Sequence, residues 1–465
     1  MKRYFKYILF TIVAISLQSC FVAKEYSRPE IVNEANYRTD NLPQDSLTLA
    51  DVSWRDLFTD VQLKQYIEEG LENNIDIRVA LQQIIAAEAY AKQGKVGYFP
   101  TVNANAQYTH QELSSNSQFG GLFSSIDQYE LSANLSWEAD IWGKIRSNKR
   151  ATQAAYLQSV AAHQAVKSRL IADIASAYYN LLALDEQLRV TEETVENREN
   201  SLETTEALKD AGVVTEVAVK QTEAQLYTAQ VLVIDLKRDI KILENTMSIL
   251  LGKEPELGTI TRGTLEAQII TSELPIGVPV QLLRNRPDII AAEYNLINTF
   301  ELTNVARSNF YPSLTLTATG GLQSLDITEL FDTNSLFATI VGGLAQPIFN
   351  RRQIKTQYEV SQAQQEQARL NFRQTFLTAS KEVSDALYSY EAASEKIEVR
   401  QKEYEALSIA TDYSEELLDN GLANYLEVLT ARENALNSSL GLVSAQNNQL
   451  QSVVNLYLAL GGGWQ

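Results

Sequence analysis

The chain has 465 residues, of which 45% are hydrophobic and 21% are charged, so most of it is expected to fold. Its 39 Lys and Arg stand against 58 Asp and Glu, and a net charge of −19 argues against a nucleic-acid binder. One Cys and two His exclude a disulfide scaffold and a Cys-rich metal site. No cofactor is expected.

The N-terminus has the features of a secretory signal. Three cations precede a short apolar run, Ile8 to Leu17, which is too short to cross a bilayer. A signal peptide over residues 1–19 is therefore predicted. Cys20, the only Cys in the chain, follows Leu17 and Ser19 as the modified residue follows a bacterial lipoprotein signal, so lipid attachment at Cys20 is predicted. The alternative is an ordinary signal peptide with an incidental Cys.

Two halves of the chain repeat the same features in the same order. Asp76 precedes Pro100 by the same distance as Asp288 precedes Pro312, and each Pro follows two aromatic residues. A Leu-Gly pair closes each half. The expected division is a signal peptide (1–19), an N-terminal extended segment with a first helix (20–70), a first repeat (71–252), a connecting segment (253–282) and a second repeat (283–465).

After each aromatic-Pro sequence, apolar and polar residues alternate, which indicates strands with one apolar and one polar face. The expected strands cover residues 99–110, 129–140, 312–320 and 336–347, and the last of them alternates less cleanly than the others. Their lengths suit tilted strands that cross a bilayer. The alternative is a soluble antiparallel sheet. Four strands cannot close a barrel, and open sheet edges are not tolerated in lipid, so a membrane location requires several protomers to share their strands.

Long helices are expected after each strand pair, because apolar residues then recur at spacings of three and four, as in coiled coils. The hairpin helices should occupy residues 143–251 and 350–460. The first arm, from Gly143 to Asp210, would be about 100 Å long as a single helix. Such apolar stripes alone would equally suit a soluble helical bundle.

Together with the repeats, three further sequence segments resemble those of the TolC-type outer-membrane efflux channels, in their lipoprotein (NodT-like) branch. They are Val52–Phe58, Asn285–Ile289 and the C-terminal Leu460–Trp464. The resemblance covers essentially the whole mature chain. It implies an α+β membrane protein in which a trimer forms one 12-stranded outer-membrane β-barrel, with four strands from each protomer. A long periplasmic α-helical coiled-coil barrel would continue from it.

The resemblance also implies a function and partners. The homotrimer would be a passive exit channel for small molecules, held in outer-membrane lipid and coupled to a periplasmic adaptor protein and an inner-membrane efflux pump. In the family the adaptor docks at the hairpin tips. In this sequence the tips correspond to Ala211, Gly212, Val213, Asn420, Gly421 and Leu422. The alternative for the two Gly residues is a plain turn that needs a positive φ.

Glu427 is the expected periplasmic gate residue. The family carries two carboxylates just past the second tip, and alignment on Gly421 places Glu427 at the first position but Thr430 at the second. Three Glu427 side chains around an axis would repel one another and could select cations. The alternative is a solvated helix face, and the missing second acid favours it.

No catalytic residues are expected, because no nucleotide-binding, hydrolase or metalloprotease motif is present. His110 and His163 are far apart and have no metal-ligand spacing around them. The rival function is a secreted structural coiled-coil lipoprotein that transports nothing. An enzyme is a distant third. A second strand pair with the same position and face pattern favours the channel, because a structural spacer has no use for it.

Overall fold

The computed structural model describes residues 22–30, 48–255 and 260–464, apart from residues 119, 123, 269–274 and 276. The predicted signal peptide and Cys20 lie outside these residues. The chain divides into two compact units, each assembled from separate stretches of both repeats. Unit 1 contains residues 1–29, 84–159 and 292–372, and unit 2 contains the remainder.

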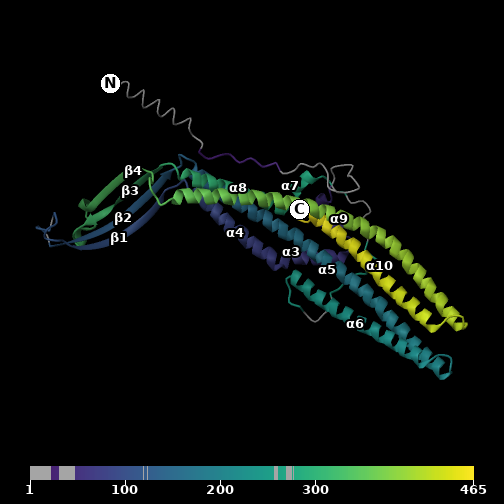
Figure 1. The fold of residues 1–465 in the computed structure, drawn as a ribbon. Helices are drawn as coiled ribbons and strands as arrows, with labels where there is room; N and C mark the ends of the chain where they lie inside the picture. Colours follow the sequence, from purple (N-terminus) through teal and green to yellow (C-terminus); the bar gives the residue numbers. More distant parts are fainter. Residues whose placement is uncertain are drawn as a thin grey trace. The chain divides into compact units, whose positions relative to one another are not determined.

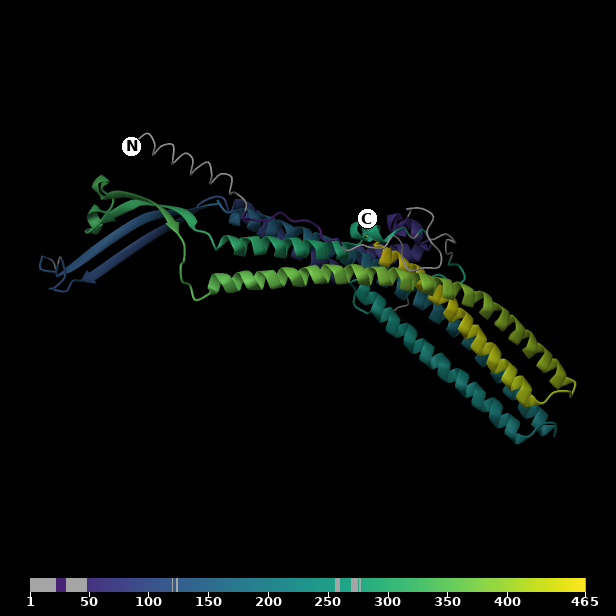
Figure 2. The same cartoon turned by 45° about the horizontal axis from the view of Figure 1, so that its top comes forward.

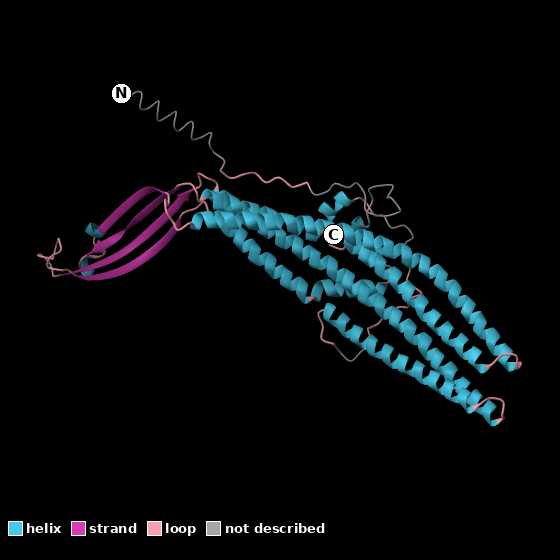
Figure 3. Ribbon diagram, viewed as in Figure 1, coloured by secondary structure: helices cyan, strands magenta, loops and turns pink. Residues whose placement is uncertain are grey.

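Unit 1 carries a four-stranded antiparallel sheet with the strand order β1-β2-β3-β4 (Figure 3). The strands are β1 (Thr101–Glu112), β2 (Ser125–Ala139), β3 (Ser313–Ser324) and β4 (Leu336–Ala345). The pairing of β2 with β3 joins the hairpin of the first repeat to that of the second. Two short 3-10 turns, Ile327–Glu329 and Thr333–Ser335, lie between β3 and β4. Two hairpins thus form one continuous sheet with β1 and β4 at its edges.

The strand register aligns the apolar residues into rows on one face of the sheet. Val102 lies opposite Leu135, and Leu135 lies opposite Ala318 on the next strand. Ala318 in turn lies opposite Ile340, so the row crosses all four strands. Asn103 lies opposite Asn134 in the neighbouring polar row. Strand β4 therefore contributes to the apolar face of the sheet, although apolar and polar residues alternate less regularly in its sequence.

Some strand boundaries differ from the expectation. Strand β2 begins at Ser125 and not at residue 129, because Ser125 to Gln128 continue the ladder opposite Glu112 to Thr109. Strand β3 extends to Ser324 and not to 320, because its pairing with β4 continues to Leu322 and its pairing with β2 continues to Ser324. Backbone pairing therefore determines the start of β2 and the end of β3, and it extends beyond the residues in which apolar and polar side chains alternate.

Four long helices contribute residues to both units (Figure 1). They are α4 (Ile75–Val96), α5 (Lys144–Asp210), α8 (Pro287–Ser308) and α9 (Gln353–Asp419). Within unit 1, Trp142 connects the start of α5 to β3, because its indole N–H donates to the Pro312 carbonyl at 2.7 Å. The Trp142 ring also packs on Tyr311 with 4.9 Å between ring centroids.

Residues 22–30 lie along α8 within unit 1. The Asn304 side chain bonds both backbone groups of Lys24, at 3.1 and 3.0 Å. The Arg28 guanidinium forms a bidentate ion pair with Glu293, with both distances 2.6 Å. The Tyr26 ring packs edge-on against Phe300. These contacts fix the chain that follows the predicted lipid-attachment site along one helix.

Unit 2 is predominantly helical (Figure 2). Its remaining helices are α2 (Trp54–Leu57), α3 (Val61–Asn73), α6 (Glu216–Leu250), α7 (Leu282–Asn285) and α10 (Tyr425–Leu460), with 3-10 turns at Leu49–Asp51 and Pro279–Gln281. Trp54, Tyr178 and Met247 are among its largest fully buried side chains. Within the described residues, none of the helices combines the length and apolar character needed to span a bilayer.

The Leu-Gly pairs close the two repeats in the same way. Gly252 and Gly461 have φ values of +73° and +93° and follow the ends of α6 and α10. A Cβ atom on Gly252 would lie 2.4 Å from the Asn73 carbonyl oxygen, and one on Gly461 would lie 2.5 Å from that of Asn285. Each Gly therefore allows both a left-handed turn and a close backbone approach.

Substituting Gly461 by Ala is expected to destabilise the protein by about 2–4 kcal/mol, because left-handed strain and a backbone clash add. Gly212→Ala is the matched control, because Gly212 has φ +78° but no atom within 4 Å of an added Cβ. It should cost about 1 kcal/mol. Thermal unfolding of the purified protein measures both. Equal losses would show that the Asn285 contact has no energetic effect.

Candidate functional site at the helical hairpin tips

Two turns join the long helices of unit 2, and both have the same hydrogen-bond pattern. In the first, Gly212 N–H donates to the Lys209 carbonyl at 2.9 Å and Val213 N–H donates to Leu208 at 2.9 Å. In the second, Gly421 bonds Leu418 at 2.9 Å and Leu422 bonds Leu417 at 2.8 Å. This pair of bonds defines a Schellman motif. No atom lies within 4 Å of an added Cβ at either Gly, so conformation alone accounts for Gly here.

Exposed apolar side chains surround both turns. Val213 is 69% exposed and Leu422 is 76% exposed, and they occupy equivalent positions in the two turns. Val217 and Leu426, four residues further along, are also equivalent and exposed. Ala211 and Asn420 precede the two Gly residues and are exposed as well. Paired exposed hydrophobic residues at both tips are typical of a surface that binds another protein.

Glu427 lies in the first turn of α10 and is exposed. Asn424 caps this helix, because its side-chain oxygen accepts the Glu427 backbone N–H at 3.2 Å. The Asn424 amide group in turn donates to a Glu427 carboxylate oxygen at 2.7 Å. Glu427 therefore supports the helix start, where a carboxylate is also favoured by the helix dipole. Glu427 remains exposed despite this hydrogen bond, so its carboxylate is accessible for a second role.

Thr430, at the second of the two expected acidic positions, is also exposed. Its hydroxyl donates to the Leu426 carbonyl of its own helix at 2.9 Å. This position therefore contributes no charge near Glu427, and Glu427 is the acidic residue in the first turn of α10.

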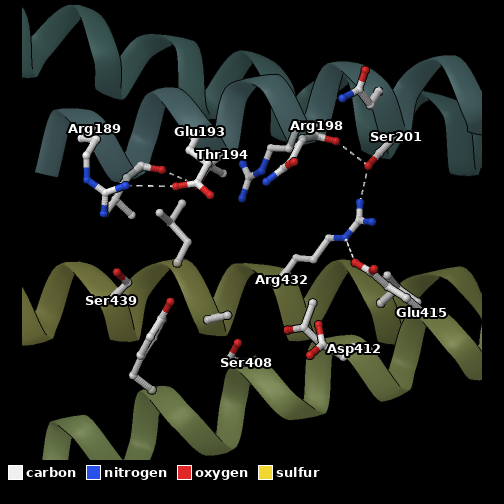
Figure 4. A pocket seen from close by; sticks show the side chains of 18 of the residues that line it. Arg189, Glu193, Thr194, Arg198, Ser201, Ser408, Asp412, Glu415, Arg432 and Ser439 are labelled. Carbon is white, nitrogen blue, oxygen red and sulfur yellow. Dashed lines mark hydrogen bonds and ion pairs between the residues drawn. The ribbon is translucent and has the colours of Figure 1, made fainter. Parts of the chain in front are cut away.

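Two arginines connect the hairpin α5–α6 to the hairpin α9–α10 behind the tips. Arg198 of α5 is buried, and its guanidinium donates to the Gln225 carbonyl of α6 at 2.6 Å and to Glu433 of α10 at 2.8 Å. Arg432 of α10 bonds Glu415 of α9 at 2.7 Å and also the Ser201 hydroxyl of α5 (Figure 4). The four helices are thus joined by charge-assisted hydrogen bonds.

Tyr425 adds a neutral connection closer to the tips. Its phenol oxygen accepts hydrogen bonds from Thr205 of α5 at 3.1 Å and from Thr222 of α6 at 2.8 Å. Both threonines are buried. The first residue of α10 therefore bonds both helices of the other hairpin.

A cavity of about 840 Å³ lies between the hairpins, lined by α5, α9 and α10 (Figure 4). Both connecting arginines line it, together with the carboxylates Glu193, Asp412 and Glu415. The wall is mixed, since hydroxyl-bearing residues such as Ser408 and Ser439 alternate with Leu and Val. In the described part of the chain, no group of three or more His, Cys, Asp or Glu is placed to hold a metal ion.

The structure brings the predicted tip residues and Glu427 to the same end of the helices of unit 2 (Figures 1 and 2). Cys20 lies outside the described residues. Arg198, Arg432 and Tyr425 are not among the residues predicted from the sequence. One signal was present, because Arg198 follows the three- and four-residue spacing of Thr191, Val195 and Leu202 and so places a charge in an apolar stripe.

Comparison with known proteins identifies relatives along almost the entire chain. A family model described as outer membrane efflux protein matches residues 66–253 and 278–462. The probable outer membrane lipoprotein SilC of Salmonella typhimurium is 28% identical over 98% of this chain and 100% of its own length. The toluene efflux pump outer membrane protein TtgC of Pseudomonas putida is 29% identical over 97% of this chain and 94% of its own.

Solved structures have the same fold. The outer-membrane channel OprN superposes with a TM-score of 0.87 at 25% identity, over 95% of this chain and 99% of its own. A structure of CusC gives a TM-score of 0.85 at 26% identity, again over 95% and 99%. The Escherichia coli K12 protein of that name is described as a cation efflux system protein, and it is 27% identical over 97% of this chain and 98% of its own length.

Proposed function

Because this chain belongs to the outer membrane efflux protein family, we propose that it is the exit duct of a tripartite pump and passes small molecules passively from the periplasmic side to the exterior. The protein is an outer-membrane channel, and its protomers combine their sheets in a trimer. The observation that carries this function is the sheet itself. It has one apolar face across four paired strands and two open edges, β1 and β4. Such edges must be paired in lipid.

The hairpin tips are the proposed docking points for a periplasmic adaptor. Both tips have the same Schellman turn and the same pair of exposed apolar residues, so an adaptor with repeated helical hairpins could bind each in the same way. We assign this contact to Ala211, Gly212 and Val213 and to Asn420, Gly421 and Leu422. The adaptor would in turn connect the channel to an inner-membrane pump. The channel supplies no energy itself, and we assign it no catalytic residue.

Co-purification tests this assignment. The full-length channel carrying Val213→Asp and Leu422→Asp should lose the adaptor and pump that the parent retains, because each substitution places a charge in an apolar contact. Leu302→Asp, at an exposed apolar position on α8, is the control and should retain both partners. Retention of the adaptor by the tip variant would assign docking elsewhere.

Glu427 is proposed to set the ionic selectivity of the closed end. If three Glu427 carboxylates converge there, Glu427→Gln should reduce cation selectivity and weaken block by divalent cations. The same substitution should change stability by less than about 0.5 kcal/mol, since the side chain is exposed.

Glu398→Gln on α9 provides the control for this experiment, because Glu398 is exposed and pairs with Lys402 of its own helix. Reversal potentials in a salt gradient should shift for Glu427→Gln and stay at the parent value for Glu398→Gln. Identical selectivity in all three proteins would remove Glu427 from the gate.

Cys20 is proposed as the lipid-attachment residue and the first residue of the mature chain. The contacts that hold residues 22–30 along α8 support this, because they would keep an acylated Cys20 close to unit 1, which carries the sheet. Radioactive fatty acid should label the parent and not Cys20→Ala. Labelling of the variant would place the lipid elsewhere.

A further inference from the structure

Cations are concentrated where the two long helices of unit 1 begin. Segments 141–152 and 346–358 contain the starts of α5 and α9, and they carry four and three Lys or Arg with no Asp or Glu. Neither helix has an acidic residue in its first turn. Cations are unfavourable there, because the N-terminus is the positive end of the helix dipole. In the first segment, carboxylates of the chain itself compensate these cations, because Lys144 pairs with Glu138 and Arg150 pairs with Glu301. The second segment is therefore the stronger candidate for binding an anion outside the protein.

The second segment also contains strained backbone at two arginines. Arg351 and Arg352 have φ values of +54° and +67°, and they are the non-glycine residues with positive φ in the described chain. In the first repeat the residue directly before the helix is Gly143, with φ +76°. Glycine adopts this conformation without strain, whereas arginine does not. Strained side-chain-bearing residues of this kind are typical of functional sites.

The two arginine side chains are accessible to a ligand. Arg352 forms an ion pair with Glu359 at 3.1 Å, yet its side chain remains 63% exposed. Arg351 is exposed, and it has no ion-pair partner among the described residues. Adjacent guanidinium groups match the geometry of a phosphate group.

Two large apolar residues directly precede the arginines. Ile348 is fully exposed and Phe349 is 88% exposed. They follow β4, whose last apolar-face residue, Leu344, is also exposed. Two further exposed apolar side chains, Ile348 and Phe349, therefore lie between the end of β4 and Arg351. Apolar residues followed by cations at the end of a membrane strand are typical of the boundary between acyl chains and headgroups.

We propose that residues 348–352 form a binding site for an anionic phospholipid of the periplasmic leaflet. Arg351 and Arg352 bind the headgroup phosphate, and Ile348 and Phe349 contact the acyl chains. This inference goes beyond the transport function and needs only the outer-membrane location of the sheet.

Lipid binding to the purified full-length trimer tests the proposal. Dioleoyl phosphatidylglycerol, dioleoyl phosphatidylcholine and inorganic phosphate are each titrated into the detergent-solubilised protein, and bound lipid is counted by native mass spectrometry. The parent should bind phosphatidylglycerol in preference to phosphatidylcholine. The variant Arg351→Gln/Arg352→Gln should bind it roughly 25-fold more weakly, because each basic residue at an anionic lipid surface contributes about fivefold. Inorganic phosphate should not compete.

The matched control is Arg369→Gln/Arg373→Gln, which removes the same charge farther along α9 and should bind phosphatidylglycerol as the parent does. Unchanged binding by the Arg351 and Arg352 variant would overturn the proposal. Competition by inorganic phosphate would also overturn it, because it would identify a phosphate site without a lipid requirement.

A second measurement separates lipid from a neighbouring protomer as the group that covers Phe349. In Phe349→Trp, the added fluorescence should be quenched by phospholipids brominated on the acyl chain, relative to the parent under the same conditions. No added quenching would mean that another copy of the chain covers this position, and the proposal would fail. Single-channel conductance of the same sample shows whether the transport function stands independently of that failure.

Discussion

Replacing Leu135 by Arg is expected to remove most of the assembled trimer from the outer membrane. Leu135 lies in β2 opposite Val102 on one side and Ala318 on the other, within the apolar row of the sheet. An Arg on the lipid-facing side of a membrane strand costs about 2–4 kcal/mol near the bilayer midplane. Each trimer would carry this cost three times.

Asn134→Arg is the control, because Asn134 is the neighbouring residue in β2 and lies opposite Asn103 in the polar row. An arginine on this face points into the water-filled interior and should reduce assembly far less. The amount of heat-resistant oligomer in outer-membrane fractions measures both variants. Equal loss at the two positions would indicate a sheet outside the membrane.

Replacing Arg198 by Gln is expected to loosen the two hairpins of unit 2. Arg198 is buried and bonds both the Gln225 carbonyl and the Glu433 carboxylate. Its loss leaves a carbonyl without its donor and a carboxylate without its cation, although Glu433 is 40% exposed and regains some hydration. We therefore expect a destabilisation of about 2–3 kcal/mol, visible as a lower unfolding temperature.

Arg189→Gln is the control for the contacts that Arg198 makes with α6 and α10. Arg189 lies on the same helix and lines the same cavity, but it is exposed. Among the described residues it pairs with Glu186 and Glu193, which belong to its own helix. Such surface pairs contribute about 0–1 kcal/mol. If both variants unfold at the same temperature, the connections of Arg198 to α6 and α10 do not stabilise the bundle.

Features encoded by local periodicity could be predicted from the sequence. The alternation of Val102, Ala104 and Ala106 predicted a strand with an apolar face, and the spacing of Leu226, Ala229 and Leu236 predicted the buried stripe of α6. The two tip turns were predictable because a tight reversal between helices needs a residue with positive φ. The family, the fold and the outer-membrane location were expected from the family resemblance, and the comparisons confirm them.

Features that depend on contacts between distant segments could not be predicted. The register between β2 and β3 joins residues far apart in the sequence, and it decides where both strands end. Arg198 and Arg432 acquire their roles only when two hairpins pack together. The contacts of residues 22–30 with α8 span more than half of the chain. The spacing around Arg198 places a charge in an apolar stripe, but it does not identify Gln225 or Glu433 as the partners.

The positive φ values of Arg351 and Arg352 could not be predicted from the sequence either. Arg351 and Arg352 precede α9 as Gly143 precedes α5, but the sequence shows no glycine there and gives no sign of positive φ. Local propensity favours an ordinary helix start at these residues. The structure instead shows positive φ at both arginines, and Arg352 occupies the position of Gly143 in the first repeat.

Single-channel recording in planar lipid bilayers tests the central claim most directly. The full-length protein, purified as a heat-resistant oligomer, is added to one side of the membrane under a salt gradient. If the protein is a trimeric exit duct, discrete conductance steps of uniform size should appear, and the reversal potential should favour cations in the parent and less so in Glu427→Gln. A folded oligomer that inserts in the bilayer but never conducts would contradict the channel and favour a purely structural lipoprotein.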